Sequence, residues 1–337
     1  MSAGNANITV RRAFRRTGDD TPKIRLTIEP LPLPLLATQV LIKVHAVALN
    51  YRDANISNGG NPWPVTPHGV IGNDAAGEVI AIGNQVKSLT VGDRVAPNTD
   101  TENLTGREST RSWLAADEDG VLADFLVYDE RILGKLPTHL DWIQASIIPC
   151  AGVTAWSALK GTGGVAMFAL KLARAMGLKV ILSSSSDQKL KTVCQQYPEP
   201  PILTVNYVQN RNWHEEVLKQ TSGFGVDICL EVGGPGTLLN SMKCTRRGGI
   251  VSQVGYLDRT KFDDALEILP TLIDRRINLR GINAGSKIDM DDLSAAITAM
   301  NIKFADIIDS TWAFDDADAA LQYLWEGKQV GKVVIQI

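Results

Sequence analysis

Apolar and polar residues alternate along the first half of the chain in the two-residue period of half-buried strands. Gln39–Leu49 alternates and then runs apolar, as a strand entering a core does. Shorter strands are expected around the turn signals Gly83-Asn84 and Gly92-Asp93, and again directly after a long polar stretch. These are Gly77–Ile82, Val86–Leu89, Arg94–Ala96 and Val121–Tyr128. The polar stretch, Pro97–Gly120, predicts a surface lobe.

From Trp142 the pattern changes to helices and short strands in alternation. Helical spacing of apolar residues predicts helices at Val165–Met176, Asp187–Tyr197, Trp213–Thr221 and Gly236–Cys244. Between and after them, buried strands are expected at Lys179–Leu182, Ile202–Val205, Val226–Glu231 and Gly249–Val254. Such alternation predicts an α/β fold with a parallel sheet covered on both faces. The tail predicts helices at Asp291–Met300 and Asp315–Glu326 and a last strand at Lys332–Ile337.

Composition excludes several classes of protein. Hydrophobic residues make up 44% and charged residues 21% of the 337 residues, which is ordinary for a globular protein of two domains. The net charge of −3 gives no nucleic-acid surface, and Arg11, Arg12, Arg15 and Arg16 are interpreted as a solvated strand face. No apolar run reaches the roughly 18 residues of a membrane span. Four scattered cysteines form no disulfide framework, so a cytoplasmic location is expected.

One glycine-rich stretch has the form of a dinucleotide-binding turn. Gly161, Gly163, Gly164 and Val165 lead into Ala166 with the spacing G-x-G-x-x-A, directly before a predicted helix. The glycines permit a tight turn and a close approach of the backbone to a pyrophosphate. The amino terminus of the following helix offers N–H groups to the phosphates. The alternating strands and helices downstream strengthen this interpretation.

About twenty residues later the chain reaches the position that contacts the cofactor ribose. A hydroxyl-rich run there includes Ser184 and Ser185, with Lys189 nearby, and this set suits the 2′-phosphate of NADPH. NADH remains possible, because Asp187 could bind the ribose hydroxyls in a shifted register. In the structural alternative the serines cap the next helix and Lys189 is solvated.

Several segments together resemble the medium-chain dehydrogenase/reductase superfamily, in its zinc-independent quinone oxidoreductase-like branch. The resemblance rests on these segments over nearly the whole chain: Ala48–Asp53, Asp74–Val79, Val91–Val95, Pro149–Trp156, Gly161–Val165, Glu231–Thr237 and Gly331–Ile335. It implies a GroES-like β-domain at 1–148 and 285–337 and a doubly wound Rossmann domain at 149–284. It also implies a small-molecule substrate and allows a homodimer. Nothing in the sequence indicates a nucleic-acid or membrane partner.

Zinc-dependent relatives hold a catalytic metal at positions that the resemblance assigns to Asn50, Asn73 and Cys150. Only Cys150 could still be a ligand, and one thiolate does not make a zinc site, so no zinc is expected. Without a Lewis acid, hydride transfer to an electron-poor double bond is easier than alcohol oxidation. The resemblance therefore implies reduction of an α,β-unsaturated carbonyl compound or a quinone.

The resemblance also assigns candidate site residues. Asn50 and Thr154 would lie against the nicotinamide, and Tyr51 or Arg52 would donate toward the substrate. In the structural alternative, Arg52 and Asp53 form an ion pair and Tyr51 only packs. Positions after successive sheet strands, where open α/β sheets bind ligands, are Gly233, Gly255 and Asn283.

One departure from the family pattern weakens the prediction of activity. A Rossmann glycine turn should follow a strand, yet Ala155–Lys160 runs directly into Gly161, so the first strand is missing or replaced. Two explanations stay open: an aberrant transcript whose product binds no cofactor, or unwinding of the residues before Gly161 into a makeshift strand. The alternative to a reductase is therefore a non-catalytic member that lacks the cofactor.

Overall fold

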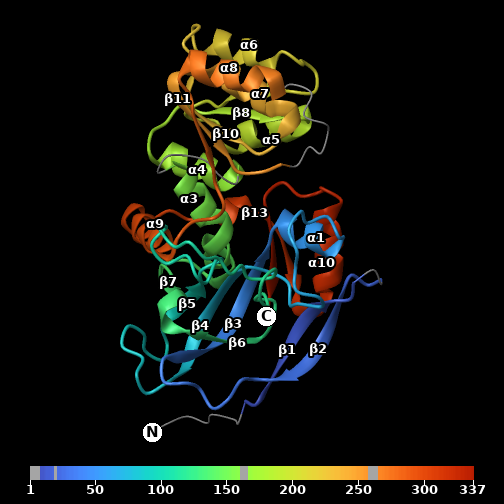
Figure 1. Cartoon of the computed structure of the whole chain (residues 1–337), viewed down its shortest axis with the longest axis vertical. Coiled ribbons are helices and arrows are strands. Elements are labelled where there is room, and N and C mark those ends of the chain that lie inside the picture. Colours follow the sequence, from blue (N-terminus) through green and yellow to red (C-terminus); the bar gives the residue numbers. More distant parts are fainter. Residues whose placement is uncertain (1–7, 19–20, 160–165, 257–264) are drawn as a thin grey trace. The chain divides into compact units, whose positions relative to one another are not determined.

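The computed structural model describes residues 8–18, 21–159, 166–256 and 265–337. The chain divides into two compact units, 1–153 with 284–337 and 154–283. Figure 1 shows the elements of each unit in the colours of the sequence.

A seven-stranded sheet forms the centre of the first unit. Six of its strands follow the order β13-β14-β3-β4-β5-β7, and β6 pairs with β3. β1 and β2 form a separate antiparallel pair. The strands of this unit are β1 (Val10–Arg16), β2 (Ile24–Pro30), β3 (Gln39–Leu49), β4 (Asp74–Ile82), β5 (Arg94–Pro97), β6 (Phe125–Asp129), β7 (Leu133–Lys135), β13 (Ile308–Ala313) and β14 (Lys332–Gln336).

Helices of the first unit are mostly short. They are α1 (Tyr51–Ser57), η1 (Glu130–Ile132), α2 (Trp142–Ser146), η2 (Ile148–Gly152), α9 (Lys287–Met300), η3 (Ala305–Ile307), η4 (Phe314–Asp316) and α10 (Ala317–Trp325). α1 and α10 lie side by side in Figure 1, although they come from opposite ends of the chain. α9 begins at a capping box in which Ser286 Oγ accepts from the Asp289 backbone N–H at 3.2 Å and Asp289 accepts from the Ser286 backbone at 3.0 Å.

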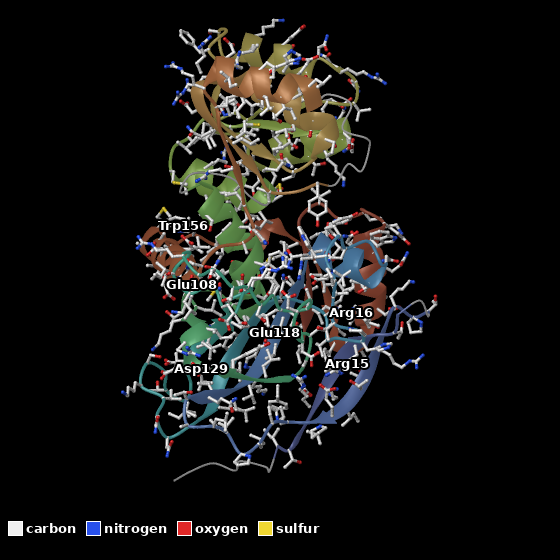
Figure 2. All side chains as sticks on the ribbon, in the orientation of Figure 1. Arg15, Arg16, Glu108, Glu118, Asp129 and Trp156 are labelled. Atoms are coloured by element: carbon white, nitrogen blue, oxygen red, sulfur yellow. The ribbon has the colours of Figure 1, made fainter. Side chains whose placement is uncertain are left out.

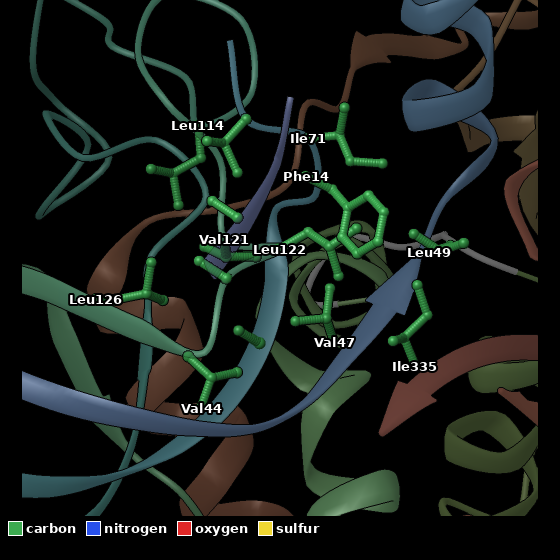
Figure 3. Close-up of a cluster of buried hydrophobic side chains, with 14 of the residues drawn as sticks. Phe14, Val44, Val47, Leu49, Ile71, Leu114, Val121, Leu122, Leu126 and Ile335 are labelled. Carbon is green, nitrogen blue, oxygen red and sulfur yellow. The ribbon is translucent and has the colours of Figure 1, made fainter. Parts of the chain in front are cut away.

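A cluster of buried apolar side chains in the core of the first unit draws residues from both of the unit's chain segments. Figure 3 shows Phe14, Val47, Leu49 and Ile335 packed together in this cluster. Phe14 meets the edge of the Phe314 ring at a centroid distance of 5.1 Å. The cluster therefore joins the antiparallel pair, the sheet and the carboxyl-terminal helix.

Two sequence predictions for this unit are wrong. Val86–Leu89 is not a strand, because the backbone N–H groups of Lys87 and Ser88 donate to the Glu130 carboxylate instead of a strand ladder. Of the four arginines of β1, only Arg12 is exposed, so the expectation of a solvated face is wrong for the other three. Figure 2 labels Arg15 and Arg16 on β1; Arg15 pairs with Glu29 and Asp119, and Arg16 is buried, donating to backbone carbonyls.

The second unit contains parallel strands that alternate with helices, as the sequence predicts. Its strands are β8 (Ile181–Ser184), β9 (Leu203–Asn206), β10 (Val226–Glu231), β11 (Thr245–Gln253) and β12 (Asn278–Gly281). Its helices are α3 (Val153–Leu159), which begins at the boundary, α4 (Ala166–Ala175), α5 (Asp187–Gln196), α6 (Trp213–Gln220), α7 (Pro235–Cys244) and α8 (Ala265–Arg275). The fold class is thus α/β, with a mainly antiparallel β-unit and a parallel one.

Parallel pairing in the second unit gives two sheets, β8-β9 and β10-β11-β12. In the usual Rossmann order 3-2-1-4-5-6, these sheets take places 3-2 and 4-5-6. Within the described residues, no strand pairs with β8 or β10 at the place of strand 1. Residues 155–159 belong to α3, so the expectation that they unwind into a makeshift strand is wrong. The glycine turn itself lies outside the described residues.

Small apolar clusters among the described residues pack helices of the second unit onto its strands. Trp213 and Val217 of α6 pack on Val205 of β9, and Met242 of α7 packs on Val251 of β11. Among the described residues, no helix combines the length and apolar content needed to cross a membrane.

Candidate functional site

Strand pairing in the first unit brings four polar residues to one end of the sheet. Leu49 at the end of β3 pairs with Val333 of β14, and Ala48 pairs with Asp74, the first residue of β4. Because both neighbours run antiparallel to β3, Lys332, Asn50 and Asp74 become adjacent. Asn73 directly precedes β4 and lies beside Asn50.

Lys332 is the cation of this polar cluster. Its Nζ donates to Leu49 O at 2.9 Å and to Asn50 Oδ1 at 2.7 Å, and it lies 3.5 Å from Asp74 Oδ2. The Lys332 side chain is 7% exposed and that of Asp74 is fully buried. A buried charge is tolerated only when it is paired and hydrogen-bonded, and Lys332 meets both conditions.

Asp74 is the anion, and besides Lys332 it collects donors from two segments. Asn50 Nδ2 donates to its Oδ2 at 2.9 Å, the backbone N–H of Ala151 donates to the same oxygen at 3.3 Å, and the backbone N–H of Cys150 donates to Oδ1. Asp74 thereby ties the start of β4 to η2 and to the residue that follows β3.

The residues of the cluster do not fit a zinc ion. Burial raises the pKa of the Cys150 thiol to about 12, so in the metal-free chain this side chain is a protonated thiol. Asn50 and Asn73 present neutral amides, and the Lys332 ammonium already occupies the cluster as its cation. Within the described ranges, no group of three or more His, Cys, Asp or Glu side chains could hold a metal ion.

Tyr51 and Arg52, the predicted substrate donors, lie in the first turn of α1. Tyr51 is 40% exposed and stacks on Trp325 with ring centroids 6.0 Å apart. Arg52 Nη1 donates to Leu114 O at 3.0 Å, and the guanidinium lies 5.8 Å from the Trp113 ring centroid. Arg52 Nη2 is buried and has no hydrogen-bond partner in the described part of the chain.

Among the described residues, Arg52 and Asp53 do not form the ion pair that the structural alternative offered. Asp53 Oδ2 instead accepts the backbone N–H of Asn50 at 2.7 Å, at the amino terminus of α1, where a carboxylate is favourable. Desolvation raises the pKa of the buried Asp53 carboxyl. Asp53 therefore fixes the backbone of Asn50, and Arg52 remains available as a donor.

In the second unit, the predicted ribose-binding residues lie at the carboxyl end of β8. Ser184 Oγ accepts from the backbone N–H of Ser186 at 3.2 Å, and Ser186 Oγ caps α5 by accepting from the Lys189 backbone at 3.3 Å. Ser185 is exposed and Lys189 is half-buried in the first turn of α5. Asp187 accepts from Asn206 Nδ2 at 2.7 Å and also from Gln209, so its carboxylate already has protein partners.

The turn after β10 is organised by Glu231, which had no assigned role in the sequence analysis. Its buried carboxylate accepts from the backbone of Gly233 at 2.7 Å and Gly234 at 2.9 Å, and from the hydroxyls of Thr237 and Ser241. Gly234 has φ 99°, and a Cβ there would lie 2.9 Å from Tyr256 Cα. A Cβ on Gly255 would lie 2.6 Å from Val232 O, so these glycines let two sheet-end turns pack closely.

The remaining predicted cofactor residues lie at separate places in the second unit or outside the described residues. Thr154 is buried at the start of α3, and Asn283 is exposed after β12. Gly161, Gly163, Gly164 and Val165 lie outside the described residues. Their role in binding a cofactor stays a prediction, as does that of Ser184, Ser185, Lys189, Gly233 and Gly255.

Sequence reasoning missed Lys332 and Asp74 as members of the site. One signal was present, because each is a charged residue directly before an apolar strand sequence, Val333–Ile335 and Ala75–Ala76. Charged residues at such positions are buried only when they have a partner. Asp74 and Lys332 are 258 positions apart, so the local sequence does not show that they are partners.

Comparisons with known proteins match both parts of the chain. Residues 37–138 match the alcohol dehydrogenase GroES-like domain, and residues 164–301 match a domain described as zinc-binding dehydrogenase. The zinc-type alcohol dehydrogenase-like protein C1773.06c of Schizosaccharomyces pombe is 33% identical, over 91% of this chain and 93% of its own length. The quinone oxidoreductase of Sus scrofa is 29% identical, over 76% and 75% of the two chains.

A solved structure supports the same assignment. A protein described as an alcohol dehydrogenase from Sinorhizobium meliloti 1021 superposes with a TM-score of 0.84 at 28% identity, covering 98% of this chain and 99% of its own. Since the two domain matches and the relatives span nearly the whole sequence, the chain belongs to the medium-chain dehydrogenase/reductase superfamily of oxidoreductases.

Proposed function

We propose that this protein is a zinc-independent, NADPH-dependent reductase of an activated carbon–carbon double bond or a quinone. The observation that carries the proposal is the buried cluster at the end of β3, where two amides and a thiol stand at the positions that the family resemblance assigns to a metal site, with the Lys332 ammonium beside them. Hydrogen-bond donors can stabilise the charge that spreads through a conjugated carbonyl group during hydride addition. The name of the Sus scrofa relative, quinone oxidoreductase, supports this class of substrate.

The chemistry of the cluster argues against a metal-dependent reaction. A divalent cation would have to bind beside the Lys332 ammonium, and the only carboxylate of the cluster, Asp74, already accepts from Asn50 and from the backbone of η2. Repulsion between like charges in a buried site makes this costly. We therefore assign the polarisation of the substrate to organic donors, with Arg52 Nη2 and the amides as the available groups.

The residues after β8 fit a 2′-phosphate better than a bare ribose. Ser184 and Ser185 offer hydroxyls, whereas the acidic alternative, Asp187, is engaged by Asn206 and Gln209. Lys189 lies in the first turn of α5, where a cation is unfavourable because the helix dipole is positive there. A phosphate bound beside Lys189 would offset this unfavourable interaction. When bound, the cofactor would supply the hydride.

A single-turnover experiment tests the reaction. Purified protein, stripped of metal with a chelator, is mixed with NADPH and duroquinone, and the loss of nicotinamide absorbance is followed. The proposal predicts turnover that does not change when zinc is added back. Activity that is lost on chelation and restored by zinc would contradict it.

The second unit favours a second candidate, a non-catalytic member of the family. Among the described strands, none joins β8-β9 to β10-β11-β12, although a Rossmann domain places its first strand there. A sheet without its central strand would lose the platform from which the glycine turn meets the cofactor. This candidate predicts a folded protein that has no affinity for NADPH or NADH.

A further inference from the structure

Asn73 has a buried donor without an acceptor. Its side chain is 0% exposed, and its Oδ1 accepts from Asn50 Nδ2 at 3.1 Å. Its Nδ2 has no hydrogen-bond partner among the described residues. A buried amide N–H left unsatisfied costs about 1–3 kcal/mol, which calls for an explanation.

The orientation of these amides is not arbitrary, because charged groups fix it. Lys332 can only donate, so Asn50 must turn its Oδ1 toward the ammonium. The Asp74 carboxylate accepts from Asn50 Nδ2, which confirms the same orientation from the opposite side. A flipped Asn50 would place its NH₂ group against the ammonium and its oxygen against the carboxylate.

Once Asn50 is fixed, Asn73 is fixed as well. The second N–H of Asn50 must donate, and Asn73 Oδ1 receives it at 3.1 Å. Turning the Asn73 amide over would bring two NH₂ groups face to face. The cation and the anion therefore fix Nδ2 as the atom of the Asn73 amide that is left without a partner among the described residues.

We infer that Asn73 Nδ2 is the donor that binds the carbonyl oxygen of the substrate. Asn50 is a positioning residue for Asn73, and Lys332 and Asp74 act through Asn50. The identity of the substrate rests on the proposed function, whereas the presence of an oxygen acceptor at Asn73 rests on the geometry alone. Because Nδ2 is sealed from solvent, neighbouring side chains must move slightly to admit the ligand oxygen.

The inferred contact would act as follows in an enone. A bound nicotinamide cofactor would supply the hydride that forms a C–H bond at the β-carbon, and the π electrons of the substrate would move through the conjugated system onto the carbonyl oxygen. Asn73 Nδ2 donates to that oxygen, where negative charge gathers. A proton from solvent then reaches the α-carbon and the carbonyl group reforms. A donor in a water-poor site is worth more to such an oxyanion than one in water.

Side-chain amide NMR tests the contact without requiring turnover. The full-length protein, labelled with ¹⁵N, is titrated with duroquinone in the absence of cofactor. The Asn73 NH₂ signals are identified because they disappear in Asn73→Ala and in Asn73→Asp. Either variant suffices for this identification, so the test needs only one of them to fold. Asn58→Asp is the matched control, because Asn58 Nδ2 already donates to Ala54 O at 2.8 Å. We expect the Asn73 signals to shift with saturation and the Asn58 signals to stay in place.

Kinetics with NADPH and duroquinone give the second readout. Loss of an oxyanion donor typically lowers kcat by about 10²–10³-fold, so Asn73→Ala should lower kcat far more than it changes KM. Lys332→Met should move the Asn73 signals before any ligand is added, and Lys332→Arg should restore their position.

The outcomes separate the inference from the proposed function. A shift of the Asn73 signals without any turnover supports the inference and overturns the reductase. Turnover that is unchanged in Asn73→Ala, or an Asn73 signal that ignores duroquinone up to its solubility limit, overturns the inference. An Asn73 signal that responds together with a kcat defect supports both.

Discussion

Lys332 Nζ donates a 2.7 Å hydrogen bond to Asn50 Oδ1 across 282 residues of sequence. The contact exists because β14 pairs with β3, so that the first residue of one strand meets the residue that follows the other. Lys332 therefore forms an ion pair with Asp74 and also fixes the orientation of the Asn50 amide in the candidate site. The stability and chemistry of this site are therefore coupled.

Removal of Lys332 should strongly destabilise the first unit. Lys332→Met leaves the buried Asp74 carboxylate without its cation, and breaking a buried pair from one side costs about 3–5 kcal/mol. Equilibrium unfolding in urea measures the loss. Adding Asp74→Asn to Lys332→Met should recover part of it, because the uncompensated charge disappears.

Lys328→Met is the matched control for this prediction. Lys328 pairs with Glu326, and both side chains are exposed. Such surface pairs contribute about 0–1 kcal/mol to the free energy of unfolding. A loss in Lys332→Met no larger than that in Lys328→Met would show that the buried pair has no special role.

The arginine–carboxylate network of β1 and β2 should make stability depend on acid pH. Burial opposes ionisation of Glu29, but hydrogen bonds from Arg15 and Arg11 outweigh it and hold the pKa of Glu29 below its ordinary value of 4.5. A carboxyl whose pKa is lower in the folded state stabilises fully above the unfolded pKa and loses this contribution as pH falls through the folded pKa.

Glu29→Gln should therefore lower the free energy of unfolding at neutral pH and flatten its decline below pH 4.5. Unfolding curves at a series of pH values measure both effects. Glu102→Gln, at an exposed carboxylate, should leave the wild-type profile intact. A Glu29→Gln profile parallel to that of the wild type would contradict the account.

Cys150 should resist alkylation in the folded protein. Its pKa of about 12 leaves almost no thiolate near pH 8, where a free cysteine is substantially ionised. Mass spectrometry after iodoacetamide treatment should find Cys150 unmodified when folded and modified in urea. Rapid labelling of Cys150 in the folded chain would indicate a reactive thiolate and reopen the case for a metal ligand.

Lys189 should set the preference between the two nicotinamide cofactors. A hydrogen bond to a charged group contributes about 1.5–3 kcal/mol, so Lys189→Ala should weaken NADPH binding by roughly ten- to a hundredfold. NADH affinity should change little. Lys191→Ala, an exposed lysine in the same helix, serves as the control. Equal losses for both cofactors would mean that Lys189 does not contact the 2′-phosphate.

Local pattern was enough to predict much of the fold. β3 alternates and then runs apolar, and it is a strand with the predicted bounds. α6 and α7 carry apolar residues at helical spacing and were also predicted. β13 was missed, because its sequence Ile308–Ala313 mixes aspartate, serine and threonine with apolar residues and gives no clear period.

Non-local partners explain what the sequence could not show. Val86–Leu89 has strand-like residues, but its backbone N–H groups donate to the Glu130 carboxylate. Glu130 lies 43 positions after Lys87 in the chain. Arg11 and Arg15 of β1 pair with Asp119, which lies 108 and 104 positions away in the polar lobe. In the candidate site, Asn50 and Cys150 came from the family resemblance, whereas Lys332 and Asp74 became visible only when strand pairing joined the ends of the chain.

Cofactor binding by the purified full-length protein tests the central claim most directly. Titration with NADPH, followed by nicotinamide fluorescence, should show saturable binding that is tighter than that of NADH. The absence of any saturable change up to millimolar concentrations of both cofactors would contradict the reductase and favour a non-catalytic member of the family.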